Sequence, residues 1–217
     1  MDFTISDEVK SVQQLAAQIM GDFTEVDKLK AIEQQDDVFD EKLWAALAEA
    51  GLLGLDIAEN QGGMGLGFFA LTVLCEEVGR TVAQIPVVPV LVGAAATLRR
   101  YGSDSQKDQW LPGIASGSTI VTSALEEYNN DDPAKPGCTA QPVEGGYALS
   151  GSKICVNQAQ TAARVLVSAH NGEELIVALL DPKAAGVTRN RQEVTAGDTR
   201  HELVMDKAQV PAEDIVA

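Results

Sequence analysis

The spacing of apolar residues changes within one stretch of the chain, Leu111 to Glu127. Before it, apolar residues recur as in amphipathic helices, and after it they form short β-type runs separated by turn signals such as Gly-Gly, Asn-Gly and Asp-Pro. A change in period from about 3.6 to about 2 residues marks the boundary between a helical domain and a β domain. The sequence therefore predicts an α+β chain of two domains. An all-α helical domain is expected over residues 1–117, followed by an antiparallel β-sandwich or barrel domain over residues 118–217.

Residues that favour helix N-caps locate the helices of the first domain. These residues are Ser6, Asp40 and Ser103. The almost wholly apolar run from Val87 to Tyr101 predicts a central, fully buried helix. The helix that begins after Ser103 is expected to end by Pro112, because proline disrupts a helix interior.

Seven runs of the second domain have the composition of strands and are bounded by turn signals. They span residues 119–125, 137–143, 147–151, 154–156, 163–169, 173–180 and 201–204. Their short, regular spacing predicts a small antiparallel sheet rather than a parallel sheet with interleaved helices.

The chain is strongly acidic. Its 32 Asp and Glu residues outnumber its 16 Lys and Arg residues, which gives a formal net charge of −16 at pH 7. Nucleic acids and anionic membrane surfaces would repel such a chain, so neither is expected as a partner. The charge is expected to serve solubility, because the hydrophobic content of 45% is ordinary for a globular protein.

The cysteines and histidines show no metal-ligand spacing. Cys75, Cys138 and Cys155 form no Cys-x-x-Cys pair, and His170 and His201 have no motif context. The first residues lack the basic and apolar regions of a signal peptide, and no uninterrupted apolar run reaches the length of a membrane span. These features predict a reduced, soluble, cytoplasmic protein with no metal site.

A glycine-rich segment, Gly62 to Gly67, resembles a nucleotide-binding loop at first sight. Its glycines do not follow the G-x-G-x-x-G spacing, and no strand leads directly into it. A phosphate-binding role is therefore not favoured.

Several motifs resemble those of the acyl-CoA dehydrogenase family. Tyr101-Gly-Ser-Asp-Ser-Gln-Lys107 is similar to the family pattern Tyr-Gly-x-x-x-Gln-Lys, and Ala58-Glu-Asn-Gln-Gly-Gly-Met-Gly65 to its loop Pro-Glu-x-x-Gly-Gly-x-Gly. Gly145 to Lys153 resembles Gly-Gly-Tyr-x-Leu-Asn-Gly-x-Lys, and Asp206 to Pro211 resembles a segment that ends in Val-Pro. The resemblance covers the whole chain. It implies that the sequence stops where a third domain, a helical bundle, begins in the family.

The resemblance also implies a reaction. Members of the family remove an α-proton from an acyl-CoA thioester with a base and transfer the β-hydride to FAD. The chain is accordingly expected to be a flavoprotein subunit or fragment of this kind, acting in lipid or related catabolism. The base and much of the FAD site would come from a domain or chain outside this sequence, so none of its own residues is expected to be catalytic. The implied partners are an acyl-CoA substrate and either a second copy of the chain or another acyl-CoA dehydrogenase chain.

By the same resemblance, two strands form one wall of the FAD site, and a turn faces the pyrophosphate. The wall residues are Ala124, Leu125, Glu126, Glu127, Cys155, Val156 and Asn157, and the turn carries Asp131 and Asp132. Glu126 stands where the family has threonine, Cys155 where it has an aromatic residue, and Asn157 where it has Thr or Ser. Carboxylates at the turn would also repel a diphosphate. FAD binding by this chain alone is therefore expected to be weak or absent.

Three functions remain open at this point. The chain could be a subunit or fragment of an active acyl-CoA dehydrogenase, or a non-catalytic, FAD-degenerate partner of an active one. It could also be a bare structural or acyl-CoA-binding module. The extent of the resemblance favours the first two.

Overall fold

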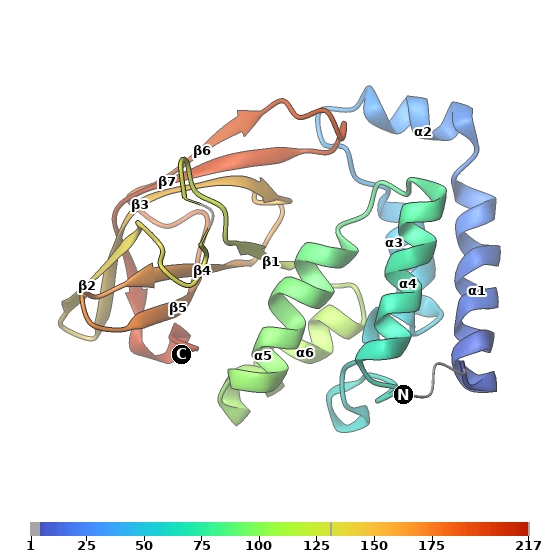
Figure 1. Ribbon diagram of the computed structural model, residues 1–217, viewed down its shortest axis with the longest axis horizontal. Coiled ribbons are helices and arrows are strands. Elements are labelled where there is room, and N and C mark those ends of the chain that lie inside the picture. The colour runs from blue at the N-terminus through green and yellow to red at the C-terminus, as the bar shows by residue number, and fades with distance from the viewer. Residues whose placement is uncertain (1–4, 131, 217) are drawn as a thin grey trace.

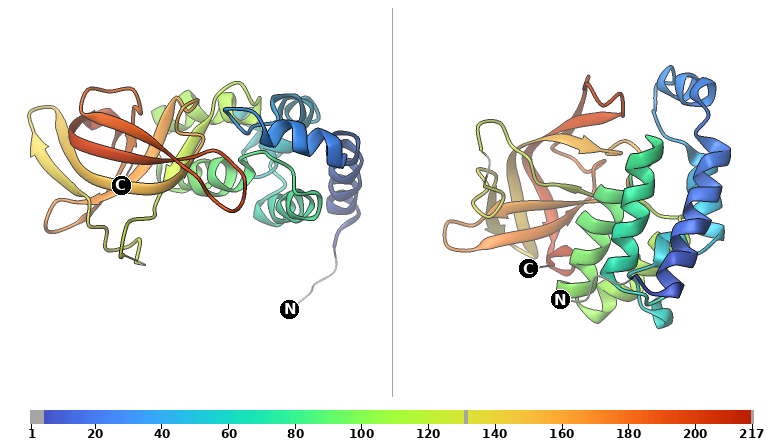
Figure 2. Two further views of the ribbon diagram at one scale, coloured as in Figure 1. Left: turned by 90° about the horizontal axis from the view of Figure 1, so that it is seen from above. Right: turned by 45° about the vertical axis from the view of Figure 1, so that its right-hand side comes forward.

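The computed structural model describes residues 5–130 and 132–216. It consists of a helical lobe followed by a β lobe, which lie side by side (Figures 1 and 2). The predicted fold class is thereby confirmed.

The helical lobe is built from α-helices and shorter helical turns. They are α1 (Asp7–Phe23), α2 (Val26–Glu33), α3 (Glu41–Glu49), η1 (Leu52–Gly54), η2 (Glu59–Gln61), α4 (Phe68–Thr81), η3 (Val88–Ala95), α5 (Ala96–Tyr101) and α6 (Asp104–Ala115). The predicted caps are present: the Ser6 and Asp40 side chains accept hydrogen bonds from the amides of Val9 and Leu43. Ser103 forms a complete capping box at the start of α6.

Two helical predictions were wrong in detail. The run from Val87 to Tyr101 is continuously helical but not fully buried: it passes from the π-helix η3 into α5 and exposes 55% of Val88 and 56% of Tyr101. The last helix also continues through Pro112 to Ala115. Leu111 and Ile114 on either side of the proline are fully buried, and this burial favours continuing the helix despite the missing N–H.

The strands of the β lobe form one curled, mixed sheet. They are β1 (Val121–Ala124), β2 (Thr139–Val143), β3 (Gly146–Asn157), β4 (Arg164–His170), β5 (Leu175–Leu180), β6 (Val187–Gln192) and β7 (Arg200–Pro211), followed by the turn η4 (Ala212–Asp214). Within the described residues the order is β1-β4-β2-β3-β7-β6, with β5 also paired to β4. Most pairs are antiparallel as predicted, but β1 and β2 each pair with β4 in parallel.

Strand β6 was not predicted from the sequence. It is an edge strand paired with β7, and its central residues Thr188 to Arg191 are polar and exposed. A strand of this kind lacks the apolar alternation that identifies a half-buried strand. Together β6 and β7 extend along the molecule toward α2 (Figure 1).

The two lobes are joined by shared packing. Val121 of β1, Leu166 of β4 and Leu179 of β5 belong to the same apolar core as the helices. The segment after β7 returns to the helical lobe, where the Gln106 side-chain nitrogen donates to the carbonyl oxygens of Glu213 and Ile215 at 2.8 and 2.9 Å. The two lobes therefore share one apolar core at their joint.

Candidate functional site

A cleft of about 460 Å³ opens at the joint between the lobes. Its helical side comes from the end of α4, the connection to η3 and η3 itself, and its β side from β1, β3 and the start of β7. The lining residues are Val78, Ile85, Pro86, Val88, Pro89, Val92, Gly93, Ser123, Leu125, Glu126, Ile154, Cys155, Asn157, Asp198 and Arg200. The helical side is apolar and the β side is largely polar, which is the usual division of roles in a small-molecule site.

The structure brings four of the predicted wall residues together in this cleft. They are Leu125, Glu126, Cys155 and Asn157. Ala124 and Val156 belong instead to the apolar core of the β lobe, behind the cleft wall. Because successive side chains of a strand point to opposite faces, only part of a predicted run can face a ligand.

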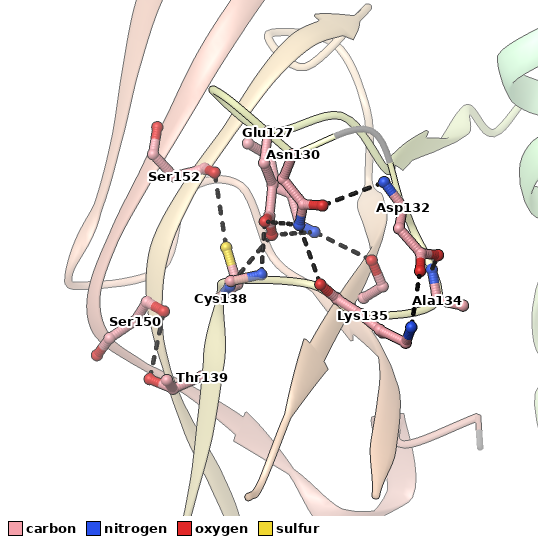
Figure 3. Close-up of polar contacts among 12 residues, drawn as sticks. Glu127, Asn130, Asp132, Ala134, Lys135, Cys138, Thr139, Ser150 and Ser152 are labelled. Carbon is pink, nitrogen blue, oxygen red and sulfur yellow. Dashed lines mark hydrogen bonds and ion pairs between the residues drawn. The ribbon is translucent and has the colours of Figure 1, made fainter.

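The remaining predicted residues are engaged away from the cleft. The Glu127 carboxylate points into the β lobe, where it pairs with Lys153. Asp132 lies in the loop before β2 and accepts a hydrogen bond from the amide of Ala134 (Figure 3). Asp131 lies outside the described residues. A role for these side chains in cofactor binding stays a prediction.

Two charged residues at the polar end of the cleft were missed in the sequence. Asp198 Oδ2 accepts from Asn157 Nδ2 at 2.8 Å, and Asp198 Oδ1 accepts from Arg200 Nε at 3.0 Å. Both residues lie near the start of β7, in no recognisable motif, and only the pairing of β7 with β3 brings them to the cleft. Asp198 therefore fixes the orientation of the Asn157 amide.

This arrangement leaves one acceptor free at the polar end. Asn157 Oδ1 is buried and has no hydrogen-bond partner among the described residues. An unpaired buried carbonyl oxygen is costly, by about 1–3 kcal/mol. Because this oxygen is not solvent-accessible in the structure, a ligand N–H or O–H would relieve that cost only after a small movement of the cleft wall.

Cys155 lies at an irregularity of β3. Its backbone has a positive φ of 55°, and the pairing of β3 with β7 shifts register between Lys153 and Val156. Its amide donates to Gln192 Oε1 at 2.8 Å, and Gln192 Nε2 in turn donates to Tyr128 Oη at 3.3 Å. Burial, together with the nearby Glu126 carboxylate, raises the pKa of the Cys155 thiol. A thiol with a raised pKa is a poor nucleophile.

The apolar side of the cleft depends on a close approach between η3 and β1. A Cβ atom at Gly93 would lie 2.2 Å from Ser123 Oγ, so only glycine fits there. Ser123 Oγ also donates to the Pro89 carbonyl oxygen at 3.3 Å. The π-helical turn and this glycine together let η3, with Pro89 and Val92, pack close to β1 on the β side of the cleft.

The described lining fits part of an FAD molecule and not the rest. The apolar wall and the free Asn157 acceptor suit a flat ring system that carries an N–H group. Arg200 is the one cation among the described lining residues, and it is ion-paired with Asp198, while Glu126 adds a second carboxylate. The Cys155 and Ile154 amides are also bonded within the protein. A diphosphate therefore finds no free cationic partner here, and these residues do not form a complete FAD site.

Residues 5–130 and 132–216 contain no cluster of His, Cys, Asp and Glu that could hold a metal ion. Nor does this part of the chain contain a helix long and apolar enough to cross a membrane.

Residues 6–118 match the sequence profile of the acyl-CoA dehydrogenase N-terminal domain. The chain belongs to the acyl-CoA dehydrogenase family. It is 34% identical to the acyl-CoA dehydrogenase FadE28 of Mycobacterium tuberculosis over 174 residues, which cover 80% of this chain and 49% of that protein. It is 28% identical to the short-chain specific acyl-CoA dehydrogenase of Sus scrofa mitochondria, over 96% of this chain and 54% of that protein.

Solved structures of this family have the same fold. A Tcur3481-Tcur3483 steroid ACAD G363A variant is 42% identical with a TM-score of 0.91, over 96% of this chain and 57% of that chain. The ChsE4-ChsE5 complex of Mycobacterium tuberculosis is 26% identical with a TM-score of 0.92, over 100% of this chain and 58% of that chain. This acyl-CoA dehydrogenase family member thus spans about half the length of the relatives it matches.

Proposed function

We propose that this chain is a subunit, or part of a subunit, of an acyl-CoA dehydrogenase that removes hydrogen from the α and β carbons of an acyl-CoA thioester. The observation that carries the proposal is the cleft between the lobes, in a chain of this family, with an apolar side and an orphaned acceptor at its polar end. Bound FAD would supply the hydride acceptor. The catalytic base and the diphosphate part of the FAD site come from a domain or chain outside this sequence.

The chain's own contribution is to shape one side of the reaction space. Pro89 and Val92 exclude water from the apolar side, and Asn157 orients a ligand group that donates a hydrogen bond. We assign no proton transfer to Glu126, because its carboxylate lies on the exposed rim of the cleft.

The acyl group that we propose is a steroid or a similarly rigid apolar group. The support is the 42% identity to a chain described as a steroid ACAD, together with the apolar face that η3 presents to the cleft. A rigid group fills such a face with little loss of conformational entropy.

A second candidate is a non-catalytic, FAD-degenerate partner that assembles with an active acyl-CoA dehydrogenase. It is supported by the ion pair that occupies Arg200, by the Glu126 carboxylate, and by two similar structures described with two named components each. Val88, Leu125 and Tyr128 are exposed apolar residues at or next to the cleft and would be covered by such a partner.

An assembled complex separates the two candidates. The chain is co-expressed with full-length acyl-CoA dehydrogenase chains, and the purified complex is tested for flavin absorbance and for oxidation of steroid and straight-chain acyl-CoA esters. If the cleft contributes to the reaction, Asn157→Ala in this chain should lower kcat/KM by about tenfold, the effect of a lost hydrogen bond to a ligand. An unchanged kcat/KM would favour the non-catalytic partner. Asp108→Asn, on the exposed face of α6, is the matched control.

A further inference from the structure

A buried ion pair lies directly behind the cleft wall. Lys153 Nζ is 2.7 Å from Glu127 Oε1, and the two side chains are 0% and 7% exposed. Lys153 Nζ also donates to Ser168 Oγ at 3.0 Å. A buried ion pair adds little to stability compared with apolar residues of the same size, so its value lies in fixing one arrangement of the chain.

The Glu127 carboxylate closes the loop that connects β1 to β2. It accepts hydrogen bonds from Asn130 Nδ2 and the amide of Cys138 (Figure 3), and also from the amide of Gly137 and from Lys153 Nζ. Four donors on one carboxylate leave it little freedom. The start and the end of the loop are therefore held together at a single point.

The residues on either side of Glu127 bond, directly or through a shared partner, to the part of β3 that lines the cleft. Immediately before Glu127, the Glu126 carbonyl oxygen accepts from the amide of Ile154 at 2.9 Å. Immediately after it, Tyr128 accepts from Gln192, which also holds the amide of Cys155.

The cation of the pair is equally close to the cleft wall. Lys153 directly precedes Ile154 and Cys155, both of which line the cleft. The ion pair thus lies next to the cleft residues on both strands, at the point where the pairing of β3 with β7 becomes irregular.

We propose that Glu127 and Lys153 are positioning residues for the cleft: their ion pair sets the relative position of the β1 end and the irregular part of β3, and with it the shape of the polar wall. The effect of the pair on ligands rests on the proposed function, whereas its effect on the backbone of the wall does not.

Amide hydrogen exchange tests the backbone effect without any ligand. The test variants are Glu127→Gln and the double variant Glu127→Gln with Lys153→Met, which leaves no unpaired buried charge. We expect exchange to become at least about tenfold faster at Ile154 and Cys155, as well as at Gly137 and Cys138. Faster exchange at Gly137 and Cys138 alone would overturn the proposal, because the pair would then hold only the loop.

Two control variants separate the effect of the ion pair from the effects of a neighbouring carboxylate and of the loop. Glu202→Gln alters a β7 carboxylate that accepts hydrogen bonds from Ser152 of β3 and Asn190 of β6 without touching the ion pair, and it should leave exchange at Ile154 and Cys155 unchanged. Asn130→Ala removes one of the four donors to Glu127 and loosens the loop, while the bond between Lys153 Nζ and Glu127 Oε1 keeps both of its partners. If this variant speeds exchange at Ile154 and Cys155 as much as the double variant does, the loop rather than the pair holds the wall, and the proposal is wrong.

The ligand effect is measured in the assembled complex with a steroid acyl-CoA ester as the probe. The double variant should raise KM about tenfold with a smaller change in kcat, because the wall positions the ligand. A wild-type complex that neither binds nor oxidises the probe would count against the proposed function, and the exchange experiment would still decide the role of the pair. A wild-type complex that is active, with a double variant of equal KM, would overturn the positioning role.

Discussion

Asn157 donates its side-chain amide to Asp198 across 2.8 Å, and Asp198 in turn holds Arg200. The single carboxylate thereby neutralises the one cation of the described cleft lining. It also orients the Asn157 carbonyl oxygen, which has no hydrogen-bond partner among the described residues.

This relationship predicts weak cofactor binding that can be improved. The isolated chain should bind FAD weakly or not at all, and Glu126→Thr with Asp198→Ser should tighten binding about fivefold for each carboxylate removed. The reason is that each substitution removes one negative charge from the cleft that an anionic cofactor would approach, and the second also frees Arg200. Flavin fluorescence during a titration measures the affinity, and Asp108→Asn removes an equal charge outside the cleft as a control. Micromolar or tighter binding by the unaltered chain would contradict this account.

The buried ion pair predicts strongly non-additive effects on stability. Glu127→Ala should cost about 3–5 kcal/mol, since it leaves the Lys153 ammonium buried without its partner. The double substitution with Lys153→Met should cost clearly less than the single one. Urea denaturation gives both free energies of unfolding, and simple addition of two independent losses would be inconsistent with a coupled pair.

Glu127 also predicts how stability changes in acid. Burial alone would raise the pKa of this carboxyl, but hydrogen bonds from Lys153, Asn130, Gly137 and Cys138 outweigh it and lower the pKa to about 2 from 4.5. The folded pKa is depressed, so the stabilisation is complete above pH 4.5 and is lost as the pH falls toward 2. Denaturation midpoints between these limits should fall steeply for the wild type and less steeply for Glu127→Gln. Equal slopes would show that the carboxyl titrates alike in both states.

His201 predicts a separate effect at milder pH. Burial, followed by the neighbouring Arg189 and Arg191, lowers the pKa of this imidazole below 6.5, and Asp37 opposes the shift. The unfolded chain therefore binds a proton first, and stability should decrease as the pH falls below 6.5. His201→Gln should remove this part of the pH dependence while leaving the acid transition in place. Thermal unfolding from pH 8 to pH 5 provides the measurement.

Gly93 predicts a steric limit on the apolar side of the cleft. Gly93→Ala should destabilise the chain by roughly 1–3 kcal/mol, because the new methyl group would meet Ser123 Oγ. Combining it with Ser123→Gly should recover part of the loss. Gly79→Ala in α4 meets no atom within 4 Å and should be neutral or stabilising. Thermal denaturation compares the three, and a neutral Gly93→Ala would show that η3 can move away from β1.

Much of the fold could be predicted because it depends on local patterns. Ser6, Asp40 and Ser103 each cap a helix by bonding the amide three residues later in the sequence. The spacing of apolar residues likewise changes between Leu111 and Glu127, because a helix and a strand bury side chains at different periods. Strand β6 could not be found in this way, because an exposed edge strand buries no regular face. Pro112 was misread because local propensity gave way to the burial of its neighbours.

The site was predictable only in part. Leu125, Glu126, Cys155 and Asn157 were identified through motifs and lie together in the cleft. The inward turn of Glu127 depends on Lys153, which follows it by 26 residues, and the roles of Asp198 and Arg200 depend on the pairing of β7 with β3. Contacts of this kind leave no periodic signal in the sequence.

The Gln106 side chain uses both ends of its amide: the oxygen completes the cap of α6, and the nitrogen holds the segment after β7. The lobes are thus connected through the covalent chain near Gly117, through their shared apolar core and through these hydrogen bonds, which together close a ring. A ring of this kind has no single hinge. The cleft can therefore adapt to ligands of different width through side-chain rotation and small shifts of η3, while a swing of one lobe away from the other would first require the Gln106 bonds to break.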